Sequence, residues 1–203
     1  MWVRGAAIRP VPPYAVVGEY VLEQIERELS SDDDDARDTI DGAFKRFEST
    51  QPELADMFTE LLAQPLDETA LALGYFLSIA VWAAFERSFK DRLRAVTAED
   101  VKATLASLDA EEELRSEHGT EPIDLDEVVA VEQPAVMAFV NQHVETALDV
   151  AAREEEEPQE APREVDVDDV YKIYRAILAL VLSLSHAVEP TSHDPVAGPE
   201  LLA

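Results

Sequence analysis

The sequence has 203 residues, no cysteine, and 44 acidic against 16 basic residues, which together give a formal net charge of −28. The missing thiols exclude disulfides, thiolate metal sites and cysteine nucleophiles, and the charge repels nucleic acid and anionic lipid surfaces. The N-terminal stretch lacks the basic start and apolar run of a secretory signal. We therefore expect a cytoplasmic protein that binds neither nucleic acid nor membranes.

Helical periodicity of apolar residues runs through nearly the whole chain, whereas strand-like alternation and glycine-containing hairpin turns are nearly absent. The sequence therefore predicts an all-α fold, a helical bundle of about eight helices. An extended lead is expected at residues 1–15, a single helical domain at 16–188 and a flexible tail at 189–203.

Three shorter helices are predicted first along the chain. An apolar stripe over residues 17–29 marks the first, and Ile40–Phe47 marks a short second helix. Between them, Asp32–Asp35 indicates either a solvated connection or a helix start. Thr50–Glu53 has the order of a capping box and predicts the start of a third helix, which Pro65 should end.

A long and unusually apolar fourth helix is predicted next, capped by Asp67 and reaching to about Arg94. It is apolar nearly all round from Leu71 to Phe85, which is typical of a helix at the centre of a core. The uncharged run Ala70–Phe85 would be about 24 Å long as a helix, shorter than the roughly 30 Å hydrocarbon core of a bilayer. We therefore interpret it as a core helix and not as a membrane span.

Helices are also predicted in the second half of the chain, and the first of them begins at a capping signal, Thr97–Asp100. Its apolar stripe, Val101–Leu108, ends before the acidic residues that start at Glu111. The remaining predicted elements are a short sixth helix at Leu125–Val131, a seventh helix after Gln133-Pro134, an acidic linker at 153–164, and an eighth helix at Val167–Val188.

Two Gln-Pro pairs suggest an internal duplication. Gln51-Pro52 and Gln133-Pro134 each end a short helix and open an amphipathic one, which an unusually apolar helix follows. This order favours two repeats at 16–96 and 97–188, that is, two pseudo-symmetric four-helix halves. Chance recurrence of helix-forming patterns is the alternative interpretation, and the sequence alone does not separate the two.

No arrangement of residues indicates catalysis. Di-iron bundles need a glutamate three positions before a histidine, zinc proteases need two histidines four apart, and phosphate sites need glycine-rich loops; none of these is present. We predict no catalytic residue, metal site or cofactor. Tyr75, Trp82 and His143 are the candidates for contact with a ligand or partner, although each also fits the interior of a helical core.

The charge and the missing chemistry together favour a non-enzymatic interaction or regulatory protein. Its expected partners are a basic protein, attracted by the acidic surface, or a second copy of the chain in a homodimer. Two alternatives are a helical bundle that holds a small apolar ligand and an enzyme whose site has no recognisable pattern. The acidity could equally serve solubility or adaptation to high salt.

Overall fold

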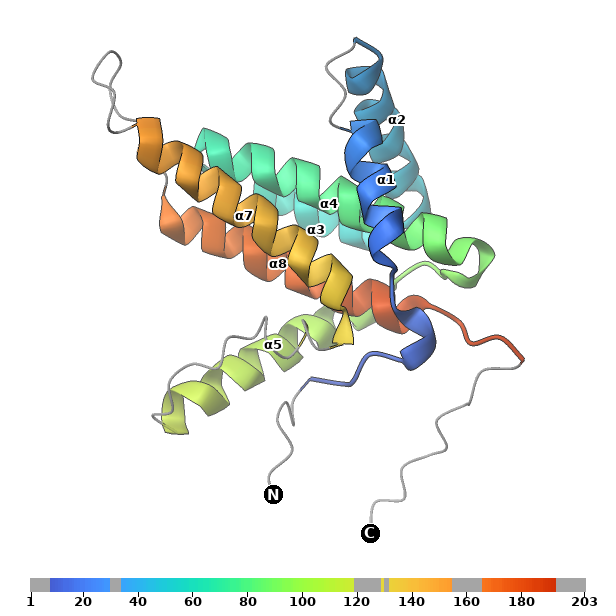
Figure 1. The fold of residues 1–203 in the computed structure, drawn as a ribbon. Helices are drawn as coiled ribbons and strands as arrows, with labels where there is room; N and C mark the ends of the chain where they lie inside the picture. Colours follow the sequence, from blue (N-terminus) through green and yellow to red (C-terminus); the bar gives the residue numbers. More distant parts are fainter. Residues whose placement is uncertain (1–7, 30–33, 119–128, 130–131, 155–165, 193–203) are drawn as a thin grey trace.

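The structure is a computed structural model that describes residues 8–29, 34–118, 129, 132–154 and 166–192. The described residues form helices and no strand, which confirms the all-α class. Figure 1 shows the arrangement of the seven α-helices of this part of the chain. They are α1 (Glu19–Leu29), α2 (Asp34–Thr50), α3 (Pro52–Leu62), α4 (Glu68–Phe89), α5 (Ala98–His118), α7 (Pro134–Glu154) and α8 (Val167–Ala187).

Helices α4 and α8 lie side by side at the centre of the bundle and run in the same direction (Figure 1). At their N-terminal ends the Asp67 N–H donates to the Asp169 carboxylate at 3.0 Å. At their C-terminal ends the Arg94 N–H donates to the Ala187 carbonyl at 3.1 Å. Most side chains of both helices are buried, because each helix is apolar on more than one face.

The same two helices are long and apolar enough to cross a membrane by length and composition alone. In each, however, 67% of the apolar window is buried within the bundle. Burial of this extent is what the core helix of a globular protein shows. The finding agrees with the interpretation of the Ala70–Phe85 run as core.

The remaining helices cover this central pair. Helix α1 packs on α4 as α5 packs on α8, while α7 contacts both α4 and α1. Helix α3 contacts α4, α8 and α5, and α2 packs against α1, α3 and α4. In Figure 1 the pair α1 and α2 rises at one end of the bundle, and α5 extends away from the other helices.

The N-terminal lead, predicted as extended at 1–15, is described from Ile8 onward. It is non-helical to Pro12, forms a single 3₁₀ turn at Pro13–Ala15, and buries Ile8 and Val11 against the helices. Polar contacts also hold it: the Val11 N–H donates to the Glu132 carboxylate at 2.7 Å. Of the predicted tail, residues 193–203 lie outside the described part of the chain.

Predicted boundaries of four helices need correction. Helix α2, expected as a short helix at Ile40–Phe47, spans Asp34–Thr50, so its start lies within the acidic run Asp32–Asp35. Helix α4 ends at Phe89, not near Arg94, because Lys90 takes a φ of 49° and the chain leaves the helix through a 3₁₀ turn, Lys90–Arg92. Helix α5 continues through the acidic stretch to His118. Helix α7 reaches Glu154 and so includes the first two residues of the linker predicted at 153–164.

Ion pairs hold the start of the acidic part of α5 against α8. The Arg175 guanidinium on α8 forms ion pairs with Asp109 and with Glu112, the latter at 3.1 Å. Acidic residues that looked like a solvated end of the helix therefore face a cation from a neighbouring helix. The sixth helix predicted at Leu125–Val131 lies outside the described residues except for Val129, which is helical and buried.

The capping box predicted at Thr50–Glu53 is wrong. Helix α3 has Gln51 as its N-cap residue, and no side chain caps it. The Thr50 hydroxyl donates instead to the Arg46 carbonyl of α2 at 2.8 Å. The Asp67 cap of α4 is confirmed, since its carboxylate accepts from the Ala70 N–H at 2.8 Å.

The two glutamines of the Gln-Pro pairs are almost completely buried and bind backbone in the same way. The Gln51 amide accepts from the Val96 N–H at 2.8 Å and donates to the Arg94 carbonyl at 3.0 Å. The Gln133 amide accepts from the Val17 N–H at 3.1 Å and donates to the Ala15 carbonyl at 2.6 Å. Each glutamine thus holds a carbonyl and an N–H two residues apart, in the segment that precedes α5 or α1.

The predicted cap of α5 is confirmed and has a pH dependence. The Thr97 N–H donates to Asp100 at 3.1 Å and the Asp100 N–H donates to the Thr97 hydroxyl at 3.2 Å. A hydrogen bond from Arg94 to the Asp100 carboxylate is the main reason that the pKa of Asp100 falls to about 2. The Asp100 carboxyl binds a proton more weakly in the folded state than in the unfolded state. Its contribution to the free energy of unfolding is therefore complete above about pH 4 and is lost towards pH 2.

We expect Asp100→Asn to lower the free energy of unfolding by about 1 kcal/mol near neutral pH, the usual value of a helix cap. The loss should shrink as the pH falls from about 4 to 2, because the wild-type carboxylate is then protonated as well. Thermal melts of both proteins across this range measure it. A difference in stability that stays constant down to pH 2 would contradict the assigned role of the carboxylate.

Two glycines in helices make a matched test of the packing. A methyl group at Gly74 of α4 would lie 2.6 Å from Cδ1 of the buried Ile173, whereas nothing lies within 4 Å of a methyl group at Gly42 of α2. We expect Gly74→Ala to destabilise the folded protein by about 1–2 kcal/mol, because the added methyl group overpacks the core. Gly42→Ala should stabilise by up to about 1 kcal/mol through helix propensity. Chemical denaturation measures both, and equal effects of the two substitutions would refute the close approach of α4 and α8.

Candidate interaction groove between α2, α3 and α4

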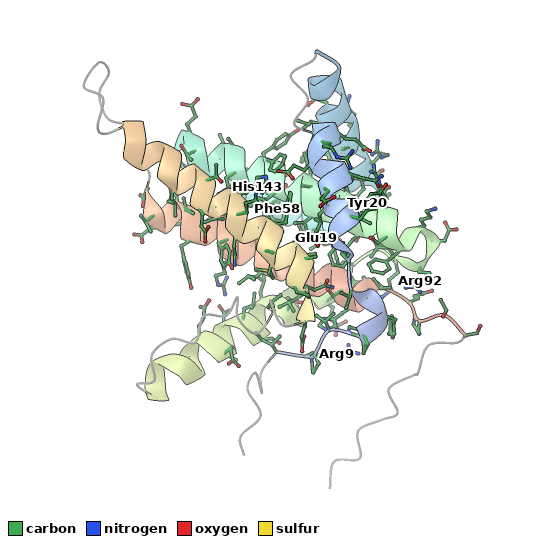
Figure 2. The ribbon with its side chains drawn as sticks, in the orientation of Figure 1. Arg9, Glu19, Tyr20, Phe58, Arg92 and His143 are labelled. Atoms are coloured by element: carbon green, nitrogen blue, oxygen red, sulfur yellow. The ribbon has the colours of Figure 1, made fainter. Side chains whose placement is uncertain are left out.

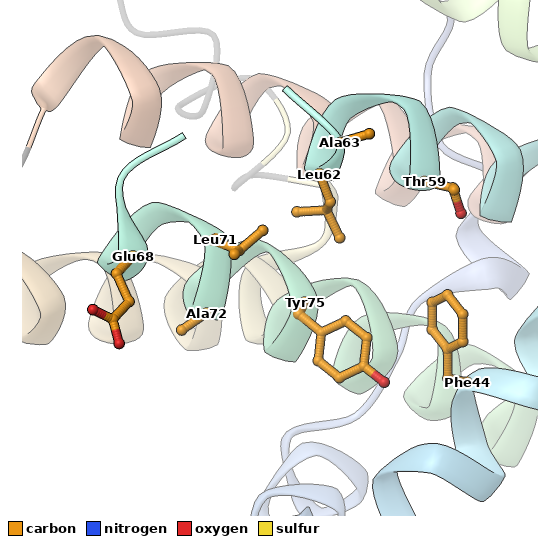
Figure 3. Close-up of a pocket in the computed structure, with 8 residues that line it drawn as sticks. All are labelled: Phe44, Thr59, Leu62, Ala63, Glu68, Leu71, Ala72 and Tyr75. Atoms are coloured by element: carbon orange, nitrogen blue, oxygen red, sulfur yellow. The ribbon is translucent and has the colours of Figure 1, made fainter. Parts of the chain in front are cut away.

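An apolar groove of about 530 Å³ lies on the surface where three helices meet. The last turns of α3 and the first turns of α4 form its two long sides, and α2 closes one end (Figure 3). The turn at residues 63–67 joins the two sides, so local chain connectivity sets their position. The lining residues are Phe44 of α2, Thr59 and Leu62 of α3, Ala63 of the following turn, and Glu68, Leu71, Ala72 and Tyr75 of α4. We refer to this groove as groove A.

Groove A is open to solvent and almost entirely apolar. Leu71 is 38% exposed and Ala72 is exposed as well, although both belong to the most apolar helix of the chain. The Glu68 carboxylate lies at one end of the groove, and the rings of Tyr75 and Phe44 lie at the other (Figure 3). Exposed apolar surface bordered by a polar group is one of the features that mark binding sites on proteins.

Tyr75, one of the three predicted candidates, lines groove A. Its half-buried ring lies 5.4 Å from the Phe44 ring, measured between centroids. Burial raises the pKa of the Tyr75 hydroxyl, and the nearby carboxylates Asp41 and Glu48 raise it further. The hydroxyl is neutral at physiological pH, and the two carboxylates contribute negative electrostatic potential at this end of the groove.

A second hollow of about 380 Å³ lies on the opposite flank of the same turns of α4, and we refer to it as groove B. It shares Glu68 and Ala72 with groove A, and its far side is formed by Ala147 of α7. Thr69, Leu73 and Phe76 of α4 complete its lining. The first two turns of α4 therefore form a ridge with a hollow on each side, groove A being almost entirely apolar and groove B of mixed polarity.

His143, the second candidate, lies between helices and outside both grooves (Figure 2). Its ring centroid is 4.3 Å from that of Phe139 and 5.0 Å from that of Phe76. Its Nδ1 lies 2.9 Å from the Phe139 carbonyl, an arrangement in which an Nδ1–H donates, and its Nε2 is 3.4 Å from the Glu26 carboxylate. The histidine thus connects α7 to α1 and supports the wall behind Phe76.

Trp82, the third candidate, is fully buried in the core. Its ring packs 5.5 Å from Phe47, and the Arg46 guanidinium lies 5.8 Å from the ring centroid. Its indole N–H is buried without a hydrogen-bond partner in the described structure. Of the three candidates, the structure therefore brings only Tyr75 to the groove.

Sequence reasoning missed most of the residues that form groove A. Leu62 appears in the sequence as part of a core stripe, and Leu71 as the start of an apolar helix. No local signal marks either side chain as exposed, because exposure depends on where α2 and α3 stop covering α4. The one available signal was the position of Leu71 and Ala72 close behind the Asp67 cap, at the end of a helix.

No metal site accompanies the grooves: within the described ranges, no group of three histidine or carboxylate side chains lies close enough to hold a metal ion. Comparison with protein-family models, with curated proteins and with solved structures finds no match to this chain. The geometry of the grooves and the charge around them are therefore the observations from which a function can be argued.

Proposed function

We propose that this protein is a non-enzymatic interaction module whose groove A binds a basic, amphipathic helix of a partner protein. The observation that carries the proposal is an open apolar groove on a chain with a formal net charge of −28. Helices that bind in grooves insert apolar side chains spaced three or four residues apart and keep their polar face in solvent. Groove A offers the apolar surface that such a face requires.

The openness of groove A favours a helix over a small apolar ligand. Sites for small molecules enclose most of the ligand, commonly 70–90% of its surface. In groove A the lining residue Leu71 is 38% exposed, and the helices cover the groove on three sides only. A small ligand would remain in contact with water there. Binding of a partner helix would bury both the apolar face of that helix and the exposed Leu71.

The charges around groove A favour a basic partner. Asp41 and Glu48 act on Tyr75 at one end, and Glu68 lies at the other. Complementary charge accelerates encounter and suppresses wrong partners more than it adds affinity. This attraction should weaken as the Debye length falls from about 10 Å at 0.1 M salt to about 3 Å at 1 M. The affinity for an uncharged apolar ligand would hold or rise over the same range.

A peptide selection tests this proposal. A displayed library of random peptides of about 16 residues, roughly four helical turns, is selected on the immobilised protein at 0.1 M salt. The expected winners carry net positive charge and apolar residues with helical spacing, and they bind less tightly at 1 M salt. Neutral winners without periodicity, or no winners at all, would overturn the proposal. Self-association in sedimentation experiments that Leu71→Glu abolishes would replace the basic partner with a second copy of the chain.

We also propose that the chain consists of two repeats related by a pseudo-twofold axis. Gln51 holds the segment that leads into α5, the first helix of the second half, and Gln133 holds the segment that leads into α1, the first helix of the first half. The helix contacts agree with this pairing of the halves, in which α1 corresponds to α5, α3 to α7 and α4 to α8. Helix α1 packs on α4 as α5 packs on α8, and α1 contacts α7 as α5 contacts α3. Comparable roles for the two glutamines are the testable consequence.

A further inference from the structure

The structure points to a partner helix that crosses α4 at Ala72 and fills groove A and groove B together, an inference that rests on the function proposed above. Both grooves include Glu68 and Ala72, so they flank the same ridge of α4. At the crossing point the ridge presents the methyl group of Ala72, one turn after Glu68 and beside the short side chain of Thr69. A helix backbone can therefore approach α4 closely at this position.

Larger side chains stand on either side of this low point. Leu71 and Tyr75 form the wall of the ridge towards groove A, and Phe76 forms it towards groove B. The outer walls come from different helices, α3 and α2 on one side and α7 on the other. A segment confined to groove A would leave the partly exposed side chains of Phe76 and Ala147 uncovered, whereas a segment that crosses the ridge covers them as well.

The width of the ridge defines the spacing that the partner needs. A helix with its side chains is about 10–12 Å across, and residues seven apart in a helix are separated by about 10.5 Å along its axis. Two large apolar residues seven positions apart would therefore reach the two grooves at once. The residue between them, three or four positions from each, lies over Ala72 and must be small.

The chemistry of the partner is thus more specific than a basic amphipathic helix. It carries a large apolar residue, a small residue about one turn later, and a second large apolar residue a further turn on. Lysine or arginine flanks this motif, because Glu68 stands at the head of the ridge and Asp41 and Glu48 lie beyond Tyr75. Close packing over a small residue of each helix gives selectivity against bulkier segments.

Photo-crosslinking to the peptide recovered in the selection above tests the crossing. Benzoylphenylalanine is placed at Leu71 for groove A, at Ala147 for groove B, and at the exposed Tyr20 of α1 as the control. We expect crosslinks from the first two positions, to peptide residues about seven apart, and none from the third. Crosslinks from Leu71 alone would overturn the crossing and leave the proposed function standing. Absence of crosslinks from Leu71 would contradict both the crossing and the proposed function of groove A.

A substitution at the low point of the ridge provides a second readout. Ala72→Phe raises the ridge between the grooves, and we expect it to weaken binding of the selected peptide at least tenfold. Ala106→Phe, at an exposed alanine on α5, is the matched control and should change the affinity less than twofold. Circular dichroism establishes that both variants are folded. Unchanged affinity of the Ala72→Phe variant would refute the crossing at this residue.

Discussion

Replacing Gln133 with methionine is expected to lower the free energy of unfolding by about 3 kcal/mol, the largest loss among the substitutions considered. Methionine has a similar length but pairs with none of the three groups that the amide binds. The Val17 N–H and Ala15 carbonyl would be left buried without partners, and the Ser185 hydroxyl, 2.9 Å from the amide nitrogen, would lose its contact with the amide. Each buried and unpaired polar group costs roughly 1–3 kcal/mol.

Gln51→Met should lower the free energy of unfolding by about 2 kcal/mol. The loss is smaller because the Gln51 amide has two partners and its hydrogen bond to the Arg94 carbonyl is only partly buried. Gln142→Met, at an exposed position on α7, is the control and should stay within about 0.5 kcal/mol of the wild type. Urea denaturation measures all three. A loss confined to one of the two buried glutamines would contradict both their shared role and the proposed repeats.

Replacing Leu71 with glutamate is expected to raise the Kd for the selected peptide at least tenfold, with little change in folding stability. The substitution puts a charge where an apolar side chain of the partner would be buried, and an unpaired buried charge is strongly unfavourable. The leucine is 38% exposed, so its replacement removes little buried surface from the free protein. Acidic residues are also favourable in the first turns of a helix.

Tyr20→Glu is the matched control for this experiment. Tyr20 is 65% exposed in the first turn of α1, so the change adds the same charge to another helix N-terminus outside the grooves. Isothermal titration calorimetry should give the control a Kd within about twofold of the wild type, because one charge added to a net charge of −28 changes the overall field little. Equal effects of the two substitutions would show that binding follows net charge and not groove A.

The fold class and several helix ends could be predicted because local patterns determine them. Helix α8 was expected at Val167–Val188 and spans Val167–Ala187, since its apolar positions and its acidic first turn lie within the helix itself. The Asp67 and Thr97 caps were predicted for the same reason, because a cap involves residues at most three positions apart.

The predictions failed where contacts with residues distant in the sequence determined the local structure. Thr50 does not cap α3, because the neighbouring Gln51 is held by backbone more than 40 residues away, at Arg94 and Val96. The grooves could not be predicted because α4 is apolar nearly all round. Its sequence therefore does not distinguish the covered face around Leu77 from the exposed face around Leu71.

Methyl NMR spectra of the protein with and without the selected peptide show where on the protein the peptide binds. We expect shifted resonances for the methyl groups that line groove A, those of Leu62, Ala63, Leu71 and Ala72. The methyl group of the exposed Ala106 on α5 should not shift. Shifts centred on α5, or spread evenly over the surface without change at Leu62 and Leu71, would show that groove A is not the binding site.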